Sequence, residues 1–482
     1  MRDVEIDRLL PAEIVSADPK LPIGGIAYSS KKVAHGDLFF CIRGFAHDGH
    51  DFAAEAVDRG AVALVVERPL PGVGVPQYVV PDARIALARA AAAFFDEPSR
   101  SLAVFGITGT NGKTTSTYLL DSIVRTDGRT TGLIGTVETV TGSQRSASTR
   151  TTPESADLIA LLARMRDAGV SAVTMEVSSH ALDLHRVEGV HFQVAAFTNL
   201  TQDHLDYHHT VEEYFSVKQR LFTEMDVEHR VINIDDPYGV RLAEEVQAPL
   251  TVGLAHDAAV RATDIQFGNA STTFSLVTPT RTSAVSLPLV GAYNVSNALV
   301  AAGCAYAAGI DPEVIAAGLS AAPQVPGRLE RITNERGFSV FVDYAHTPDG
   351  LAKALDAVRA VTPGRLFVVF GAGGDRDPDK RPMMGRVAAR GADHVIVTSD
   401  NPRSEDPVGI ILQIEDGLRE GTATYEVQVD RRTAIRTGIC RCRPADSLLI
   451  AGKGHEDYQI FADRTVHFDD REVAAEELMH PC

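Results

Sequence analysis

The chain has 482 residues, of which 44% are hydrophobic and 23% charged, a composition that indicates a globular protein and excludes a disordered one. Its length suggests two to four domains. The net charge of −18 argues against nucleic acid as the main partner, because binding to a phosphate backbone requires a basic surface.

The apolar segments predict neither membrane insertion nor secretion. The nearest candidate for a membrane span, residues 85–95, is too short and is interrupted by Arg89. Residues 1–15 carry acids and no apolar core, so we expect no secretory signal. The five cysteines are scattered without the paired spacing of a zinc site, which predicts free thiols in a reducing compartment. We therefore expect a cytoplasmic protein, and we expect a monomer.

Residues 1–99 predict a small N-terminal α/β domain. Short apolar runs at 37–42 and 61–66 are separated by glycine-rich turns, and the alanine-rich segment 83–95 predicts a helix. Residues 96–100 are typical of a linker, which places a domain boundary there.

Residues 100–330 predict a central domain built on a parallel sheet. Continuous apolar runs occupy 102–107, 172–177, 194–197 and 231–234, as expected of strands buried on both faces. Helical stretches lie between these runs, so the pattern indicates an α/β fold.

Residues 331–482 predict a second doubly wound domain of the Rossmann-like type. Predicted strands begin at 338, 366 and 394, two intervals of 28 residues, and another occupies 448–452. Such spacing suits repeated right-handed crossovers. The run "GAGGDR" at 371–376 lacks the third spaced glycine of a dinucleotide fingerprint, so we expect no NAD site.

The segment "GITGTNGKTTST", residues 106–117, departs by one residue from the phosphate-binding loop pattern, because Ile107 stands where the first glycine is expected. A strand precedes the segment and a helix follows it, as such a loop requires. Lys113 would reach the outer phosphates of ATP, and the Thr114 hydroxyl would bind Mg²⁺. The alternative is a glycine-rich turn with an incidental lysine, which the strand–loop–helix context disfavours.

This loop resembles that of the Mur ligases, which add amino acids one at a time to the UDP-linked peptidoglycan precursor. The resemblance implies three α/β domains, namely a UDP-binding domain (1–99), an ATP-binding domain (100–330) and an amino-acid-binding domain (331–482). It rests on further segments in chain order: TTPE (151–154), MEVSSHALDLHR (175–186), TNLTQDHLDYH (198–208), EYFSVKQRLF (213–222), GAYNVSNALVA (291–301), PGRLE (326–330), DYAHTPD (343–349), GAGGDRDPDKRPMMG (371–385), DNPR (400–403) and AGKGHEDYQ (451–459).

The resemblance implies an ATP- and Mg²⁺-dependent amide ligase. Its catalytic residues would be Lys113, His204 and Lys218, and its metal ligands Thr114, Glu176, His204 and Lys218. The pattern around Lys218 alone indicates a solvated helix lysine, but Mur ligases carry a carbamylated lysine in this segment. The implied ATP contacts are Gly109, Thr110, Asn111, Gly112, Lys113, Thr114, Thr115, Asn294, Asn297, Arg328, Asp343 and His346.

The UDP-muramoyl dipeptide would be the acceptor. Segment 27–52 resembles the uridine-binding stretch of the family, but it carries Ser29-Ser30-Lys31 where Asp-Ser-Arg is usual, and the lysine lacks a bidentate fork. The implied acceptor contacts are Ser30, His50, Thr151, Thr152, Ser178, Arg186 and Lys218.

The "DNPR" tetrad at 400–403 indicates the incoming amine. Arg403 offers a planar fork for a carboxylate, Asp400 an acceptor for an ammonium, and Asn401 either kind of hydrogen bond. The far end of meso-diaminopimelate carries both groups, whereas L-lysine ends in an ammonium alone. The tetrad is also the form seen in diaminopimelate-adding family members. The predicted amine contacts are Arg376, Asp400, Asn401, Arg403, Gly452 and Glu456.

The implied reaction joins meso-diaminopimelate to the D-glutamyl γ-carboxylate of the acceptor through an acyl phosphate. Domain closure would bring ATP and the amine together. Two alternatives remain open: the same reaction with L-lysine or another diamine, and a nucleotide-binding module that no longer ligates. A folate polyglutamylating ligase shares the general loop and layout, but it would not be expected to carry the uridine stretch or the "DNPR" tetrad. No side chain identifies itself as the base for the amine proton.

Overall fold

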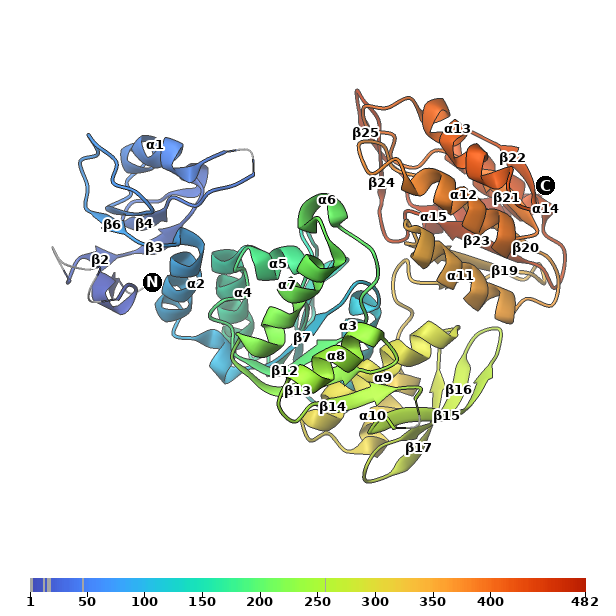
Figure 1. Ribbon diagram of the computed structural model, residues 1–482, viewed down its shortest axis with the longest axis horizontal. Coiled ribbons are helices and arrows are strands. Elements are labelled where there is room, and N and C mark those ends of the chain that lie inside the picture. Colours follow the sequence, from blue (N-terminus) through green and yellow to red (C-terminus); the bar gives the residue numbers. More distant parts are fainter. Residues whose placement is uncertain (1–2, 12–13, 15–18, 46, 256) are drawn as a thin grey trace.

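The computed structural model describes residues 3–11, 14, 19–45, 47–255 and 257–482. Within these residues the chain folds into three α/β domains, as predicted. Figure 1 shows the N-terminal domain and the C-terminal domain at opposite ends of the molecule with the central domain between them. The described residues contain no helix that is both long and apolar enough to cross a membrane.

The N-terminal domain contains a small parallel sheet with the strand order β3-β4-β5-β6. Its helix α2 begins where predicted, because the Asp82 side chain accepts hydrogen bonds from the backbone N–H groups of Arg84 and Ile85. The elements are β1 (Val4–Glu5), β2 (Pro22–Ile23), β3 (Gly25–Ala27), β4 (Asp37–Phe40), α1 (Ala53–Asp58), β5 (Ala63–Val66), β6 (Gln77–Val79) and α2 (Ala83–Phe94).

The central sheet runs β10-β9-β8-β11-β7-β12-β13-β14-β15-β16-β17. Its middle is parallel, as predicted, whereas β9 and β10 at one end and β16 and β17 at the other are antiparallel additions that the sequence analysis missed. The strands are β7 (Ala103–Thr108), β8 (Thr131–Ile134), β9 (Glu138–Thr141), β10 (Gln144–Ala147), β11 (Ala172–Glu176), β12 (Phe192–Phe197), β13 (Val227–Asn233), β14 (Leu250–Gly253), β15 (Val260–Phe267), β16 (Thr272–Val277) and β17 (Thr282–Leu287).

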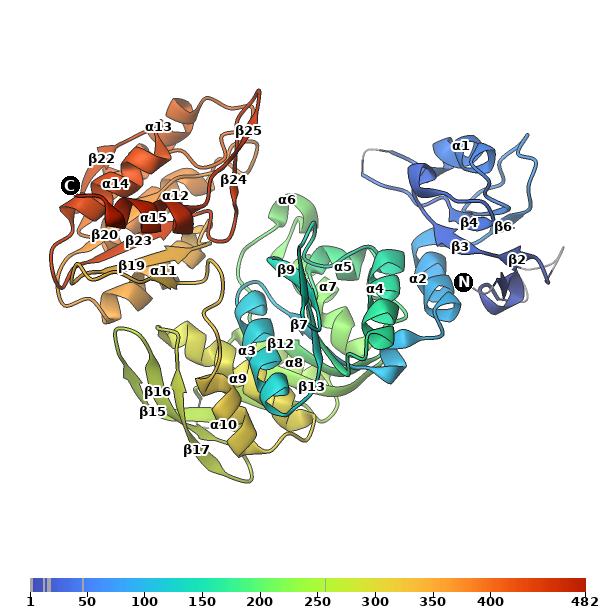
Figure 2. The same cartoon turned by 180° about the vertical axis from the view of Figure 1, so that it is seen from behind.

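Helices cover both faces of the parallel part, which explains why its strands are continuously apolar. Val104 of β7 faces one hydrophobic cluster, and its neighbour Phe105 faces the other. Helices α3 and α10, which pack against each other (Figure 2), both contribute residues to the second cluster. The helices are α3 (Lys113–Thr126), α4 (Ser155–Asp167), α5 (Ser179–Asp183), α6 (Leu205–His208), α7 (Val211–Thr223), α8 (Pro237–Glu245), α9 (Ala292–Ala307) and α10 (Pro312–Ser320).

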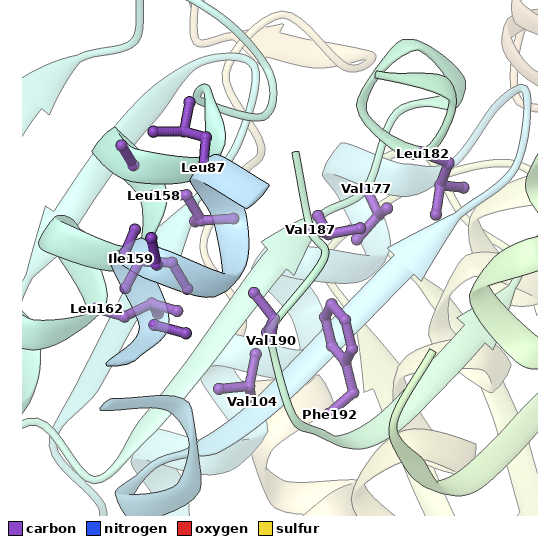
Figure 3. Close-up of a cluster of buried hydrophobic side chains, with 14 of the residues drawn as sticks. Leu87, Val104, Leu158, Ile159, Leu162, Val177, Leu182, Val187, Val190 and Phe192 are labelled. Atoms are coloured by element: carbon purple, nitrogen blue, oxygen red, sulfur yellow. The ribbon is translucent and has the colours of Figure 1, made fainter. Parts of the chain in front are cut away.

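The first cluster crosses the boundary between the N-terminal and central domains. Figure 3 shows Leu87 of α2 beside Leu158 and Ile159 of α4, with Val104 and Phe192 on the neighbouring strands. Burial of this apolar surface fixes α2 against the central domain.

Gly106, which stands one position before the glycine that the phosphate-loop pattern expects, has a packing role in this cluster. Gly106 lies within β7, and a methyl group there would come within 2.6 Å of the Phe192 ring. Ile107, which stands where the loop pattern expects glycine, is buried in the cluster on the opposite face. The departure from the loop pattern therefore follows from the packing of the strand.

The C-terminal domain contains the predicted parallel sheet, with the order β18-β19-β23-β20-β21-β22. Its edge strands β22 and β18 were not predicted, and β18 is antiparallel to β19. The elements are β18 (Glu330–Ile332), β19 (Ser339–Asp343), α11 (Pro348–Ala360), β20 (Leu366–Phe370), α12 (Lys380–Gly391), β21 (His394–Val397), α13 (Pro407–Leu418), β22 (Thr424–Val427), α14 (Arg431–Arg441), β23 (Ser447–Ala451), β24 (Tyr458–Ile460), β25 (Thr465–His467) and α15 (Asp470–Met479).

The prediction that all the cysteines are free thiols is wrong. Cys440 near the end of α14 forms a disulfide with Cys482, which follows α15, across a Cα–Cα distance of 5.3 Å. Helices α14 and α15 pack together, so the two cysteines meet although 42 positions separate them. Cys41, Cys304 and Cys442 are free. The cysteines therefore no longer argue for a reducing compartment.

Candidate functional site

A cavity of about 480 Å³ opens where the phosphate loop, the carboxyl ends of the central strands and the carboxyl end of β19 in the C-terminal domain meet. This volume falls within the range of small-molecule sites, and the carboxyl edge of a parallel sheet is where such ligands bind. Many of the predicted residues line the cavity: Thr110, Asn111, Gly112, Lys113, Thr114, Thr115, Thr151, Glu176, Ser178, His204, Asn297, Arg328, Asp343 and His346.

The phosphate loop is held by the segment that follows β12. The backbone N–H of Thr110 donates to the carbonyl of Asn199 at 2.8 Å, and the Thr198 hydroxyl donates to the carbonyl of Asn111 at 2.6 Å. The Lys113 ammonium lies against the loop and donates to the carbonyl oxygens of Gly109 and Thr110. Burial lowers the pKa of Lys113, against the opposing effect of nearby carboxylates.

Gly112 closes the loop at the start of α3 with a left-handed φ of +86°, and a Cβ there would lie 2.1 Å from Asn297 Oδ1. We expect Gly112→Ala to displace Asn297 and to weaken ATP binding at least about tenfold, equivalent to about 1.4 kcal/mol. Isothermal titration calorimetry with ATP measures this effect.

Gly128 provides a matched control, because its φ is +83° and nothing lies within 4 Å of the Cβ that alanine would add. Gly128→Ala should lower the free energy of unfolding by about 1–2 kcal/mol through backbone strain and leave ATP affinity intact. Equal ATP affinities for the two variants would contradict a role for Gly112 beyond its backbone conformation.

Glu176, at the end of β11, is buried and joins the phosphate loop to the loop after β8. It accepts a hydrogen bond from the Thr114 hydroxyl at 3.0 Å and others from the backbone and hydroxyl of Thr136. Arg328, from the segment that connects the central and C-terminal domains, also donates to the Thr114 hydroxyl at 3.2 Å. The predicted pair Thr114 and Glu176 is thus in direct contact, beside a cation from the connecting segment.

The two predicted asparagines of α9 share one face but occupy different environments. Asn297 lines the cavity, whereas Asn294 is fully buried and donates to the carbonyl of Val290. The Asn297 side chain donates to Asn294 Oδ1 at 3.2 Å. Asn294 therefore orients Asn297, and its direct contact with ATP stays a prediction.

Lys218 is buried, contrary to the solvated position that its sequence pattern alone indicates. Its ammonium donates to the carbonyl of Gly109 at 2.9 Å and lies 4.5 Å from the centre of the Tyr214 ring. Burial, reinforced by nearby Lys113, lowers the pKa of Lys218 well below its ordinary value. His204 also lies near Tyr214, with the two ring centres 6.4 Å apart.

Several residues of the cavity were not predicted. Asp203 lines the cavity near Lys113. Burial lowers the pKa of Lys113, and the charge of Asp203 partly offsets that effect. Asp349 of α11 accepts a hydrogen bond from the Asn111 side chain at 3.1 Å and pairs with Lys353, so the phosphate loop touches the C-terminal domain. Their segments were recognised in the sequence, but side-chain contacts between domains leave no periodic signal. The others are Thr136, Thr198, Asn199, Asn233, Asp235, Asp236, Tyr293, Ser296, Val300, Tyr344, Ala345, Thr347 and Gly350.

The two predicted uridine contacts are buried within the N-terminal domain. Ser30 donates to Glu55 at 3.0 Å. The two ring nitrogens of His50 are occupied, one by the Asp48 carboxylate at 2.6 Å and the other by the backbone N–H of Glu67 at 3.0 Å. These bonds give both side chains a structural role, and their contacts with uridine stay predictions.

The predicted dipeptide contacts lie around the end of β11. The Thr152 hydroxyl donates to the carbonyl of Glu176 and accepts from the backbone N–H of Ser178. Arg186 donates to the carbonyl of Thr152 at 3.4 Å and faces Glu154 at 3.5 Å. Thr151 contacts Thr136 through their hydroxyls. The set is close to the cavity, and Thr152 is buried as a support for it.

The predicted amine residues gather at the carboxyl ends of β21 and β23. Arg403 donates to the carbonyl of Gly374 at 2.7 Å through Nη1. Asp400 lies against Gly452, where a Cβ would come within 2.5 Å of its Oδ2, and Gly452 itself bonds to the carbonyl of Asp343 in the cavity wall. We call the predicted amine residues the amine pocket. Through Gly452 this pocket adjoins the cavity at the phosphate loop.

Asn401 makes several hydrogen bonds within the protein, and its contact with the amine stays a prediction. Its Oδ1 accepts hydrogen bonds from the Lys453 ammonium and the backbone N–H of Ile460, and its Nδ2 donates to Glu456 at 2.8 Å. Asn401 thus braces the pocket, and little of its amide remains for a ligand. Arg376 is exposed at the rim.

Three family models match this chain in order. They are "Mur ligase family, catalytic domain" over residues 22–95, "Mur ligase middle domain" over 107–305, and "Mur ligase, glutamate ligase domain" over 327–454. The first two ranges fall within the N-terminal and central domains, and the third begins in the connecting segment before residue 331 and covers most of the C-terminal domain.

Individual proteins match over almost the whole chain. UDP-N-acetylmuramoyl-L-alanyl-D-glutamate–2,6-diaminopimelate ligase of Geobacillus thermodenitrificans is 46% identical over 460 residues, 94% of each chain. The protein of the same name from Geobacter metallireducens is 45% identical over 500 aligned positions, 98% of each chain. A solved structure of a ligase of that name is 32% identical, covers 100% of both chains and superposes with a TM-score of 0.73.

Proposed function

This chain belongs to the Mur ligase family, and on that premise we propose that it joins 2,6-diaminopimelate to UDP-N-acetylmuramoyl-L-alanyl-D-glutamate at the expense of ATP. The relatives above carry this activity in their names. The product would be a precursor of peptidoglycan.

The placement of Arg403 and Asp400 supports the proposed choice of substrate. Arg403 donates to the Gly374 carbonyl through Nη1, and Asp400 lies against Gly452, so both belong to the loops at this edge of the C-terminal sheet. A carboxylate suits the fork and an ammonium suits Asp400. An amino-acid group at the far end of the incoming amine satisfies both side chains, whereas a lone ammonium leaves Arg403 unpaired.

The chemistry proceeds in two transfers. The γ-carboxylate of the D-glutamyl residue attacks the γ-phosphate of ATP, so that an acyl phosphate forms and ADP leaves. The amine of diaminopimelate then attacks the acyl carbon, the carbon–nitrogen bond forms, phosphate leaves with the electron pair, and the amine proton is released. Lys113 and Arg328 beside the loop neutralise the phosphate charge that develops.

The residues around Thr114 fit Mg²⁺. The Thr114 hydroxyl and the Glu176 carboxylate lie 3.0 Å apart at the loop, and both are the hard oxygen donors that Mg²⁺ prefers. Bound Mg²⁺ supplies charge neutralisation at the phosphates; His204 and carbamylated Lys218 are the further ligands we propose.

The domain roles follow the same proposal: UDP binding for 1–99, ATP binding for 100–330, and amine binding for 331–482. The contact of Asn111 with Asp349 across domains supports a closure that brings the amine pocket toward the phosphate loop. We propose that a monomer carries out the reaction.

Phosphate release from ATP tests the proposed function. Purified protein would be mixed with Mg²⁺ and the UDP-muramoyl dipeptide, with meso-diaminopimelate or L-lysine added in parallel. Release that depends on diaminopimelate is expected. Phosphate release with L-lysine but not with diaminopimelate would contradict the proposed selection of the amine by Asp400 and Arg403. A folded, ATP-binding protein that releases phosphate with neither amine would favour a non-ligating nucleotide-binding module.

A further inference from the structure

Lys453 is a fully buried lysine whose hydrogen-bond partners are residues of the amine pocket. It lies in the loop after β23, and its ammonium donates to Asn401 Oδ1 at 3.2 Å and to Glu456 Oε2 at 3.3 Å. Its ammonium also lies 5.5 Å from the centre of the Tyr458 ring. A buried cation is costly unless it is paired, and both polar partners of Lys453 belong to the pocket.

The charged side chains of the pocket carry a small positive excess. Asp400 and Glu456 contribute two negative charges, and Arg376, Arg403 and Lys453 contribute three positive charges, so the formal sum of these five described side chains is +1. Lys453 is paired with Glu456. This pairing leaves Asp400 and the two arginines as the charges available to a ligand.

A pocket with this excess disfavours a ligand group that carries a positive charge alone. The zwitterionic end of an amino acid adds one positive and one negative charge and leaves the formal sum unchanged. A lone ammonium adds an uncompensated positive charge to a buried region, which low dielectric makes costly.

We propose that Lys453 is a specificity-determining positioning residue: by pairing with Glu456 it sets the charge of the pocket to accept an amino-acid group and to reject a lone ammonium. It acts through Glu456 and Asn401 and touches no substrate. This inference rests on the proposed function, and it adds a residue that the "DNPR" tetrad does not contain.

Removal of the Lys453 charge should weaken this preference. Without it, Asp400 and Glu456 face only Arg376 and Arg403, so the positive excess is lost and a lone ammonium is disfavoured less. Asn401 Oδ1 would also lose one of its two donors and keep only the backbone N–H of Ile460. The pocket would then discriminate less between diaminopimelate and lysine.

The test compares kcat/KM for meso-diaminopimelate and for L-lysine in wild type and Lys453→Met, measured by phosphate release. We expect the ratio of the two values to fall by about tenfold or more, as loss of one partner of a buried charge pair does at interfaces. The KM for diaminopimelate should rise while the KM for ATP stays unchanged. A parallel loss with both amines would indicate a purely structural role and overturn the proposal.

Three further variants control the result. Lys453→Arg keeps the charge and should keep the ratio. The double variant Lys453→Met/Glu456→Gln returns the formal sum of the pocket to that of the wild type and should recover discrimination, and it decides the question if Lys453→Met does not fold. Because Glu456 is itself a predicted amine contact, the comparison uses the ratio of the two amines and not the rate with either one. Arg419→Met removes an exposed cation of the same domain and should leave the ratio unchanged.

The outcomes separate this inference from the proposed function. Wild-type protein that releases phosphate with neither amine would overturn both. Wild type that discriminates, together with a Lys453→Met protein that discriminates equally well, would overturn the inference alone.

Discussion

Lys113→Met is expected to reduce kcat/KM for phosphate release by about 10³-fold or more while the protein stays folded. Lys113 begins α3 at the phosphate loop, and its ammonium lies against the carbonyl oxygens of Gly109 and Thr110. We propose that it serves there as the loop's cation for the outer phosphates of ATP. Methionine keeps the aliphatic stem and removes the charge.

The stability of this variant separates catalysis from folding. Burial lowers the pKa of Lys113, so the folded protein holds the charged form at a cost in free energy. Methionine removes that cost, and the free energy of unfolding should be unchanged or higher by denaturant titration. Near-normal turnover would contradict the assignment of the loop, and a collapse in stability would show that Lys113 is structural.

The parallel cores of the fold were predictable because helices cover their strands on both faces. Segments such as 102–107 and 366–370 are continuously apolar for that reason, and they form β7 and β20 within one residue of the prediction. The antiparallel strands β16 and β17 have one face exposed and alternate in burial. Their sequence carries no continuous apolar run, so the analysis missed them.

The site was predictable where local sequence determines it. The loop, the strand end that carries Glu176, and the "DNPR" tetrad all follow apolar strands directly, and parallel sheets bring such ends to one edge. Burial of a side chain from the middle of a helix has no such signal. Lys218 and Asn294 therefore appear in sequence as ordinary helix residues, although the fold encloses both.

Contacts between distant segments were the least predictable. The bonds of Lys453 to Asn401 and Glu456 depend on two loops that meet only because β21 and β23 lie in one sheet, with β20 between them. The disulfide of Cys440 and Cys482 depends in the same way on the packing of α14 with α15. The spacing of these residues along the chain predicts neither the hydrogen bonds of Lys453 nor the disulfide.

Lys218→Met is expected to reduce kcat by about 10³-fold, comparable with the loss of a central charge-stabilising group. Lys218 is held between the carbonyl of Gly109 and the Tyr214 ring, and its pKa lies well below the ordinary value because the side chain is buried. A larger share of its amine is therefore neutral than in an exposed lysine. A neutral amine can attack CO₂, form a nitrogen–carbon bond and release one proton, which converts a buried cation into a carbamate.

The carbamate suits this position for two reasons. The modified nitrogen keeps one N–H, so the hydrogen bond to the Gly109 carbonyl can persist. Conversion to an anion also removes the repulsion between Lys218 and Lys113 that burial intensifies. The new carboxylate oxygens would be hard donors at the phosphate loop, as Mg²⁺ requires.

Carbon-13 NMR of wild-type protein in labelled bicarbonate should show a carbamate signal that Lys218→Met lacks. Removal of CO₂ by degassing should lower wild-type activity reversibly, and acetate should partly restore Lys218→Ala by supplying a carboxylate in the space left by the side chain. An active wild-type protein without the signal and without CO₂ dependence would refute carbamylation. Loss of activity in Lys218→Met would then report only the missing support under Gly109, because the same side chain also anchors the loop through that carbonyl.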